Sequence, residues 1–440
     1  AHEQSSSFPP IVPDYCNVTL PCNMALPAFM VEGATHIRAE VQCGRENMVL
    51  EGEDELCLDD IKSLTSTLAV TDGQEAGLSV TLSVWSPEHP SGIRYAPFAV
   101  TLSADSIDRY VTYRLVPPGY EGWHEMSIRQ RDLTCYDERV LVAIDGSDNG
   151  CVNCHTSCWG KASHRMYHRR GEGGGTYFVA DGREQLVDLK EKGLQGSYPA
   201  WHPGGRYIAF ANTDTHQGFY HSSRDKIEVY DLAGRMFVYD VQRGVEIADE
   251  RFADSTLWHT FPAFSHDGRT LYYCRARAVD MPHGADSLHY ELVAADFDAE
   301  TGALGADRTM DVAQHGRSVS FPRVSPDGRF LMFTVADCGT FPIWHKEADL
   351  AMIDLRSGVP LDLSAINSDD VESYHCWSSN SRWVVFSSRR DDGRYTRLYF
   401  AHIDSLGRAA KPFMLPQRSP RHNIMRMNSY NVPDFADEEI

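Results

Sequence analysis

Hydrophobic and polar residues alternate along much of the chain with a period of two, which is the pattern of half-buried β-strands. In the first quarter of the chain the alternation is clearest in LSVTLSVWS, YAPFAVTLS and DRYVTYRLV, which are separated by turns rich in glycine, proline and serine. These strands predict a small antiparallel β domain over residues 46–115, with one short helix in the segment LDDIKSLTSTL. Residues 1–45 contain too many prolines for regular structure and predict an extended arm.

An internal repeat occupies the second half of the chain. Each copy begins with an aromatic residue, continues through a polar turn that ends in Gly-Arg or Ser-Arg, and ends in an apolar strand. The four copies are YPAWHPGGRYIAF (198–210), FPAFSHDGRTLYY (261–273), FPRVSPDGRFLMF (321–333) and YHCWSSNSRWVVF (374–386). Further short strands lie between them, as expected for one four-stranded sheet per repeat in a radial arrangement. We therefore predict a mainly β fold, with a β-propeller of six or seven blades over residues 116–440.

The turns of the repeats carry their own signal. An Asp-Gly pair supplies the positive φ angle that a tight hairpin requires. The first copy has Gly204 in place of the aspartate, and the fourth has Asn380-Ser381 in place of Asp-Gly, so we expect these two copies to keep the strands with an altered turn. We also expect the C-terminal segment SYNVPDF to pair with residues near 125–145, because closure of the ring removes an exposed sheet edge.

Residues 151–155 read Cys-Val-Asn-Cys-His, the pattern through which c-type haem is attached to a polypeptide. Two cysteines three positions apart can form thioethers with the two vinyl groups of one porphyrin, and the adjacent histidine can then bind the iron. For a chain with 11 Cys and 19 His, chance predicts about 0.01 copies of this pattern. We therefore predict one covalent haem c on Cys151, Cys154 and His155, within residues 147–175, as a loop that projects from an early blade.

A six-coordinate haem needs a second axial ligand. His164, Met166 and His168 are close in sequence; His168 is our preferred ligand, whereas Met166 would raise the reduction potential. A distant ligand and an open iron site are the alternatives. Arg169 and Arg170 are predicted to pair with the haem propionates, because a guanidinium binds a carboxylate through two hydrogen bonds. Ordinary surface charge is the alternative for both arginines.

Zinc is the main alternative to haem as the group that this segment binds. Cys151, Cys154, His164 and His168 form the pattern C-x2-C-x9-H-x3-H, which is close to that of a zinc finger. The middle spacer is shorter than usual and holds a third cysteine, Cys158, which argues against a finger. A redox-active or disulfide-bonded cysteine pair is a further alternative.

Charge and composition restrict the partners and the compartment. The formal net charge of −21 argues against nucleic acid as a partner, because the phosphate backbone requires an excess of Lys and Arg. The same charge is compatible with a cationic redox partner.

The sequence contains no apolar run of about 18 residues, so no transmembrane helix is predicted. The chain begins with Ala1, and covalent haem is attached outside the bacterial cytoplasm, so we expect an exported, periplasmic or outer-membrane-associated protein whose signal peptide has been removed. Some of the nine other cysteines are expected to form disulfides there.

The S-P-D-G-R repeats resemble the WD40-like repeats of TolB-type propellers over residues 198–390. Together with CVNCH, FPIWHKEADL (341–350), WSSNSRWVVFSSRRDDG (377–393) and the closing MLPQ and SYNVPDF segments, they make most of the chain similar to TolB-like proteins of the Bacteroidetes envelope that bear a haem motif. This resemblance implies an exported propeller with one c-type haem, compatible with a multiprotein envelope assembly. It implies no defined reaction.

Three functional classes remain after these observations. The first is a monohaem cytochrome that transfers electrons to or from an envelope protein. The second is an interaction scaffold with a structural or sensory haem or zinc, and the third is a haem-based enzyme acting on a small molecule. No residue is predicted to be catalytic, and no G-x-S-x-G motif supports a hydrolase. His345, between strand-like segments, is interpreted as a packed, hydrogen-bonded residue, with a role as haem ligand or proton carrier as the alternative.

Overall fold

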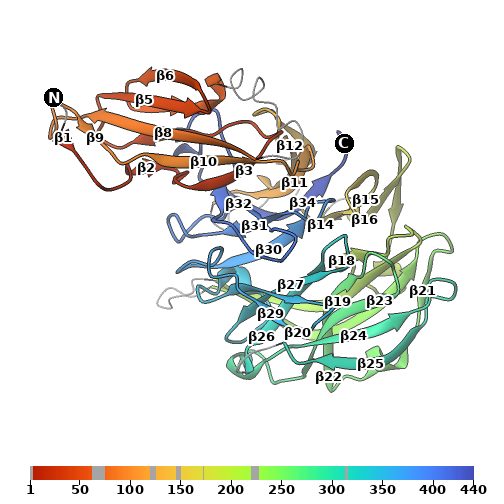
Figure 1. Cartoon of the computed structure of the whole chain (residues 1–440). Helices are drawn as coiled ribbons and strands as arrows, with labels where there is room; N and C mark the ends of the chain where they lie inside the picture. Colours follow the sequence, from red (N-terminus) through yellow and green to blue (C-terminus); the bar gives the residue numbers. More distant parts are fainter. Residues whose placement is uncertain are drawn as a thin grey trace.

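The computed structural model describes residues 3–61, 75–118, 125–144, 150–171, 173–219, 227–312 and 316–440. Within these ranges, six four-stranded antiparallel sheets follow one another around a common axis, and we number them as blades 1 to 6. The first strand of each blade contacts the first strand of the next, and β34 contacts both β30 and β14, which closes the ring. The fold is therefore a six-bladed β-propeller (Figure 1).

The blades have these strands. Blade 1 contains β14 (Cys151–Cys158), β15 (Lys161–Arg170), β16 (Gly175–Ala180) and β17 (Arg183–Val187), and blade 2 contains β18 (Ser197–Trp201), β19 (Tyr207–Phe219), β20 (Ile227–Asp240) and β21 (Val245–Ile247). Blade 3 contains β22 (Leu257–Phe264), β23 (Thr270–Arg277), β24 (Glu291–Phe297) and β25 (Leu304–Met310), and blade 4 contains β26 (Ser318–Val324), β27 (Phe330–Ala336), β28 (Asp349–Asp354) and β29 (Pro360–Leu361). Blade 5 contains β30 (Glu372–Trp377), β31 (Trp383–Ser388), β32 (Arg397–His402) and β33 (Phe413–Met414). Blade 6 combines the C-terminal β34 (Ser429–Ala436) with β11 (Tyr110–Val116), β12 (Ser127–Asp132) and β13 (Glu138–Ala143).

The remaining strands form an N-terminal β domain. One sheet contains β1 (Glu3–Gln4), β3 (Val18–Pro21), β5 (His36–Cys43), β6 (Glu46–Gly52), β8 (Ala76–Trp85), β9 (Ile93–Arg94) and β10 (Phe98–Ser103), and a smaller sheet contains β2 (Ile11–Val12), β4 (Ala28–Val31) and β7 (Glu55–Cys57). Helical turns are short: η1 (Leu58–Ile61), η3 (Lys190–Lys192), η4 (Glu250–Ala253), η5 (Ala285–Ser287), η7 (Pro342–Trp344) and α2 (Arg421–Met425). No helix among the described residues is long and apolar enough to cross a membrane.

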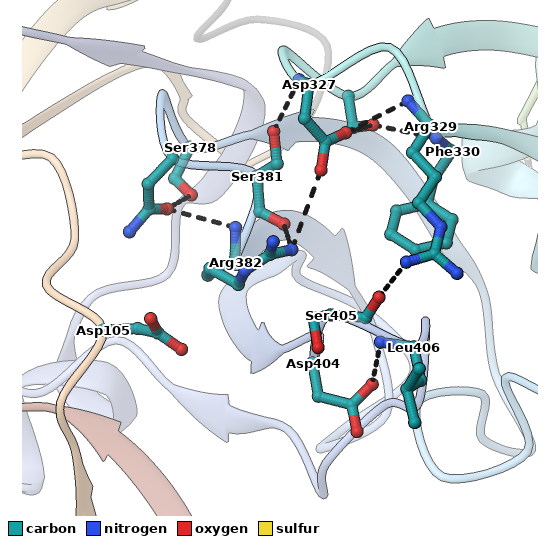
Figure 2. A network of polar contacts seen from close by, with 12 residues as sticks. Asp105, Asp327, Arg329, Phe330, Ser378, Ser381, Arg382, Asp404, Ser405 and Leu406 are labelled. Carbon is teal, nitrogen blue, oxygen red and sulfur yellow. Dashed lines mark hydrogen bonds and ion pairs between the residues drawn. The ribbon is translucent and has the colours of Figure 1, made fainter. Parts of the chain in front are cut away.

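The repeat turns explain why the imperfect copies still fold. In the third copy, Ser325 Oγ donates to Asp327 Oδ1 at 2.6 Å and accepts from Phe330 N at 2.9 Å. The fourth copy makes the same two bonds from Ser378, at 2.6 Å to Asn380 Oδ1 and 3.0 Å from Trp383 N, and Ser381 adopts the positive φ that glycine has in the other copies. The two turns also contact each other, because Asp327 N donates to Ser381 Oγ at 2.9 Å (Figure 2).

The N-terminal domain and the propeller share one hydrophobic core. The largest cluster of buried side chains joins residues of β3, β5, β8 and β10 with residues of blade 5 such as Trp383, Phe400 and Phe413. Trp383 Nε1 donates to Asp105 O at 3.1 Å, and Tyr15 Oη donates to Met414 O at 3.1 Å. Figure 1 shows the N-terminal strands (red to orange) against the blue strands of blade 5.

Four details of the sequence interpretation need correction. Residues 1–45 are not an extended arm, because β3 pairs with β10 and β5 pairs with β6 and β8. DRYVTYRLV does not belong to the N-terminal domain, because its strand β11 lies between β12 and β34 in blade 6. The segment SYNVPDF does close the ring, but its partner is β11 rather than residues 125–145, which supply the outer strands of the same blade. The helix expected in LDDIKSLTSTL is the short η1 in its first residues, and residues 62–74 lie outside the described part.

Candidate functional site: the central channel

The innermost strand of every blade has the same irregularity. At one position in each strand the pairing register shifts and one residue has a positive φ between 48° and 53°. These six residues are Cys154, Tyr198, Phe261, Phe321, Tyr374 and Val432. A β-bulge turns a side chain out of the normal alternation. Repeated six times, it surrounds the channel axis with one ring of side chains.

This ring is aromatic on four blades and small on two. Neighbouring ring centroids are 4.6 Å apart for Tyr198–Phe261, 4.2 Å for Phe261–Phe321 and 5.1 Å for Phe321–Tyr374, so the four side chains form a continuous arc. We call these four residues the aromatic arc. Blades 1 and 6 carry Cys154 and Val432 at the same position. The smaller side chains leave space opposite the arc.

The space is a cavity of about 410 Å³, which we call the upper chamber. Its walls include Arg114, Cys151, Cys154, His155, Arg170, Tyr198, Thr213, Phe321, Phe341, Trp344, Tyr374 and Val432. Residues three positions apart point to opposite faces of a regular strand. Because the register shifts between Asn153 and Thr156, Cys154 leaves that alternation, and both cysteines of the CxxCH motif line the same cavity. Burial raises the pKa of the Cys151 thiol, and the nearby Arg170 and Arg114 oppose this effect.

The CxxCH motif is therefore part of the propeller and not a projecting loop. Residues 151–170 form β14 and β15, the two inner strands of blade 1. Cys154-His155 occupies the repeat position held by Tyr374-His375 in blade 5 and by an aromatic-proline pair in blades 2 to 4. The haem motif thus coincides with the most repeated feature of the fold.

His155 is buried between blades 1 and 6. Its ring lies beside the backbone of Thr112 and Val432, and neither ring nitrogen makes a standard hydrogen bond with the described residues. His375 is the equivalent residue of blade 5, and its Nε2 lies 3.1 Å from Met332 O. Burial lowers the pKa of His155 to about 3, with the charge of Arg114 adding to the effect. The imidazole is neutral, which is the form that binds a metal.

The other predicted haem residues are distributed over β15. Arg170 is paired with Cys151 across the strands and lines the upper chamber. Met166 is buried and packs with Phe178 and Trp201 in the core between blades 1 and 2, and it lines with His155 a separate cavity of about 410 Å³ between blades 1 and 6. His168 lies beside Thr176, with Nδ1 3.1 Å from Thr176 Oγ1, and burial lowers its pKa to about 4. Met166, His168 and Arg169 are not among the residues that line the upper chamber in the described structure.

The zinc pattern is not gathered in space. His164 pairs with Ala180, whereas Arg170, six residues further along β15, pairs with Cys151. At about 3.3 Å per residue these ends of the strand are roughly 20 Å apart. Among the described residues, no group of three or more His, Cys, Asp or Glu is placed to hold a metal ion. All eleven cysteines are free thiols, so the expected disulfides are not formed in this structure.

A second set of repeat positions lies where two cavities of the channel meet. In each inner strand this position lies two residues after the one that contributes to the ring of six side chains. The residues there are Thr156, Ala200, Ala263, Arg323, Cys376 and Asp434. Thr156, Arg323, Cys376 and Asp434 line both the upper chamber and a second cavity of about 300 Å³, the lower chamber. We call these four residues the waist. Asp434 Oδ2 accepts from Ser157 N at 2.7 Å and from Ser157 Oγ at 2.8 Å, so the waist also joins blade 6 to blade 1.

The upper chamber is electropositive although the chain is acidic. Its fully charged side chains are Arg114, Arg170 and Arg323 against one carboxyl group, Asp434. Burial raises the pKa of Asp434, and the hydrogen bonds from Ser157 oppose this effect. A cavity lined by one sign of charge attracts ligands of the opposite sign.

One loop lies over the aromatic side of this chamber. Phe341, Ile343 and Trp344, in and beside η7, contribute to its wall. His345 ties this loop to blade 2, because its Nε2 is 2.8 Å from Glu228 Oε2 and its Nδ1 is 3.3 Å from Glu347 Oε1. Burial alone would lower the pKa of His345, but the bonds to both carboxylates raise it to about 10. The interpretation of His345 as a hydrogen-bonded packing residue agrees with this geometry.

The residues present fit a covalently attached haem. Two thiols line one cavity, and they adjoin a buried imidazole whose nitrogens make no standard hydrogen bond with the described residues. Aromatic rings form the opposite wall, and Arg114 and Arg170 also line the cavity. The cavity volume lies within the usual range for small-molecule and cofactor sites, roughly 300–1,000 Å³. When bound, the haem would supply one-electron chemistry at iron.

Sequence reasoning found the cysteines but missed most of the cavity wall. Arg114, Arg323, Tyr374 and Asp434 are each far from the CxxCH motif in the chain. The internal repeat is the signal that could have identified Arg323, Tyr374 and Asp434. Aligning NCHTS and NVPDF with the four copies places Thr156, Arg323, Cys376 and Asp434 at one position.

Comparison with family models and with curated proteins found no match. The fold is similar to oligogalacturonate lyase from Vibrio parahaemolyticus, with 12% identity, a TM-score of 0.38, and coverage of 77% of this chain and 88% of that one. It is also similar to a putative 6-phosphogluconolactonase from Bacteroides fragilis, with 12% identity, a TM-score of 0.35, and coverage of 70% and 96%. Hydrazine synthase from Kuenenia stuttgartiensis is similar with 12% identity and a TM-score of 0.45, over 75% of this chain and 46% of that one. These likenesses concern the fold alone.

Proposed function

We propose that this propeller is a redox protein that carries one c-type haem in the upper chamber and exchanges electrons with a partner protein. The observation that supports it is the convergence of Cys151 and Cys154 on one cavity, opposite the aromatic arc. On a regular strand two cysteines three positions apart would point to opposite faces, so in β14 the bulge at Cys154 is needed for both thiols to line one cavity.

The surrounding residues have distinct roles in this proposal. The aromatic arc offers an apolar wall to the flat face of the ligand and excludes water. Arg114 and Arg170 pair with the propionates, since guanidinium groups bind carboxylates through paired hydrogen bonds. His155 provides the iron ligand, in the neutral form that its buried position favours. Burial and these charges set the reduction potential.

Partner and compartment follow from the same proposal. A haem bonded to cysteines is attached outside the cytoplasm in bacteria, so we place the mature protein in the periplasm or at the outer membrane. The resemblance to TolB-like envelope propellers supports this location. The net charge of −21 favours a cationic redox partner, because opposite charges accelerate encounter.

The test is to produce the chain in a host with haem-attachment machinery and to measure its absorption spectrum and pyridine haemochrome. We expect a c-type spectrum that survives denaturation, and its loss in the double variant Cys151→Ser/Cys154→Ser. Cys158→Ser is the matched control, because Cys158 is on the same strand but is buried in the blade core. Covalent haem in the double variant, or none in the unaltered chain, would contradict the proposal, and a haem-free folded protein would favour the scaffold function.

A further inference from the structure

Arg323 is the one cation of the waist. The other blades carry a threonine, two alanines, a cysteine and an aspartate at its repeat position. Its guanidinium lies inside the channel and borders both chambers. The side chain is still partly accessible, because its surface faces the cavity.

This guanidinium has no counter-ion within the described part of the chain. Its one hydrogen bond there runs from Nη1 to the adjacent Pro322 O, at 2.9 Å. Asp434 is near enough to influence it, but forms no ion pair with it. The oxygens of Asp434 are taken by other donors: Oδ2 by Ser157, and Oδ1 by Cys376 Sγ at 3.4 Å.

A buried charge without a partner is costly, by several kcal/mol for an ion in a protein interior. A guanidinium presents its donors as a planar fork that matches two oxygens of a carboxylate or related oxyanion. Arg323 lies between two cavities of about 410 and 300 Å³, and among the described residues its guanidinium donates only to Pro322 O. Its other donors are therefore available to an oxyanion in the channel. The rim of the lower chamber includes exposed Lys161, Ser379 and Asp437, so this cavity reaches the protein surface.

We propose that the waist of the channel is a binding site for a small planar oxyanion, such as a carboxylate or a nitrogen oxyanion, held by Arg323 and reached through the lower chamber. The site uses other residues than haem attachment does, because Arg323 comes from blade 4 and the cysteines of the motif come from blade 1, although all three line the upper chamber. The ligand would occupy the channel between the solvent and the upper chamber.

The test is calorimetric titration of the full chain with sodium nitrite and with sodium formate, at constant ionic strength set with chloride. We expect saturable binding of about one anion per chain, weakened at least tenfold in Arg323→Ala. Alanine is the residue of blades 2 and 3 at this position, so the fold accommodates it. Arg356→Ala, an exposed arginine of the same blade, is the control and is expected to bind as the unaltered chain does.

A second measurement locates the anion and needs no variant. Cys376 borders both chambers, so a bound anion at the waist should slow its alkylation by iodoacetamide, measured by mass spectrometry of the peptide. Burial raises the pKa of this thiol, so the reaction is run at pH 9, where more of the reactive thiolate is present. The exposed thiol of Cys22 is the internal control and should react at an unchanged rate. Equal binding by Arg323→Ala, or no protection of Cys376, would overturn the proposal. Binding that persists in protein without haem supports this site even if the proposed haem function fails.

Discussion

Asp231 on β20 is fully buried, and neither of its carboxylate oxygens has a hydrogen-bond partner among the described residues. It pairs in register with Thr215, which lines the upper chamber. Burial raises the pKa of this carboxyl to about 8, and the nearby Asp214 adds to the effect. At neutral pH the group therefore holds a proton beside the channel.

The sign of its effect on stability follows from the raised pKa. Between about pH 4 and pH 8 the folded chain keeps a proton that the unfolded chain releases, so stability falls as pH rises through this range. The substitution Asp231→Asn removes this pH-dependent loss of stability, because the amide side chain stays neutral at every pH. We expect the variant to be more stable than the unaltered chain at pH 8.5 by a few kcal/mol, at about 1.4 kcal/mol per unit of pKa displacement, and close to it at pH 5.

Urea unfolding at the two pH values measures this difference. Asp311→Asn, at an exposed position, is the control and should show no such pH dependence. If Asp231→Asn is destabilised equally at both pH values, the carboxyl makes contacts that outweigh its cost of burial.

At the scale of elements, the loop around η7 is joined to blade 2 by an imidazole that lies between two carboxylates. His345 connects this loop, an insertion between β27 and β28, to Glu228 at the start of β20. Glu347 has its pKa lowered to about 2, chiefly by the hydrogen bond from His345. The contact therefore joins blades 2 and 4 across the mouth of the channel.

Replacing His345 with glutamine should loosen this connection in a pH-dependent way. The folded pKa of about 10 lies above the unfolded value of 6.5, so the stabilisation is complete below pH 6.5 and is lost as pH rises to 10. We expect His345→Gln to lower the free energy of unfolding by about 3 kcal/mol at pH 6 and by clearly less at pH 10. Denaturant unfolding at both pH values checks this, with the exposed His289→Gln as the matched control. A loss that is the same at both values would show that packing, and not charge, dominates.

At the scale of the whole molecule, a segment from the first third of the chain and the C-terminal strand make one blade. Strand β34 is the inner strand of blade 6, and the other three strands come from residues 110–143. This strand also supplies Val432, the sixth member of the ring of side chains around the channel, and Asp434, one of the four waist residues. The N-terminal domain covers blade 5 within the same hydrophobic core, so domain and propeller are expected to unfold together.

Truncation tests this interdependence. Deletion of residues 428–440 removes β34, exposes the edge of β11 and opens the ring, so we expect loss of the cooperative thermal transition and rapid proteolysis. Deletion of residues 439–440 leaves β34 intact and is the control, with only a small expected change. A cooperative transition that survives the larger deletion would show that five blades and the N-terminal domain are sufficient for folding.

The blades themselves were predictable because their signals are local. Strand alternation and the Ser-x-Asp-Gly turn each involve residues within a few positions of one another, and even Asn380-Ser381 keeps the bonds of the pattern. The pairing of β11 with β34 was not predictable in its register, because it joins segments more than 300 residues apart. Nothing local in DRYVTYRLV distinguishes a strand of a small domain from a strand of a blade.

For the candidate site, too, some features could be predicted from local sequence and others could not. The sequence alone determined that Cys151, Cys154 and His155 form a haem-attachment pattern and that the chain has a repeating β fold. Only the tertiary structure decided that this pattern lies on an inner strand and that a bulge brings Cys154 to the cavity that Cys151 lines. It also decided that Tyr374, Arg323 and Asp434 share the channel with them. The physical reason is that spacing along a strand sets the order of side chains, whereas the closed ring of six blades sets which side chains face one another.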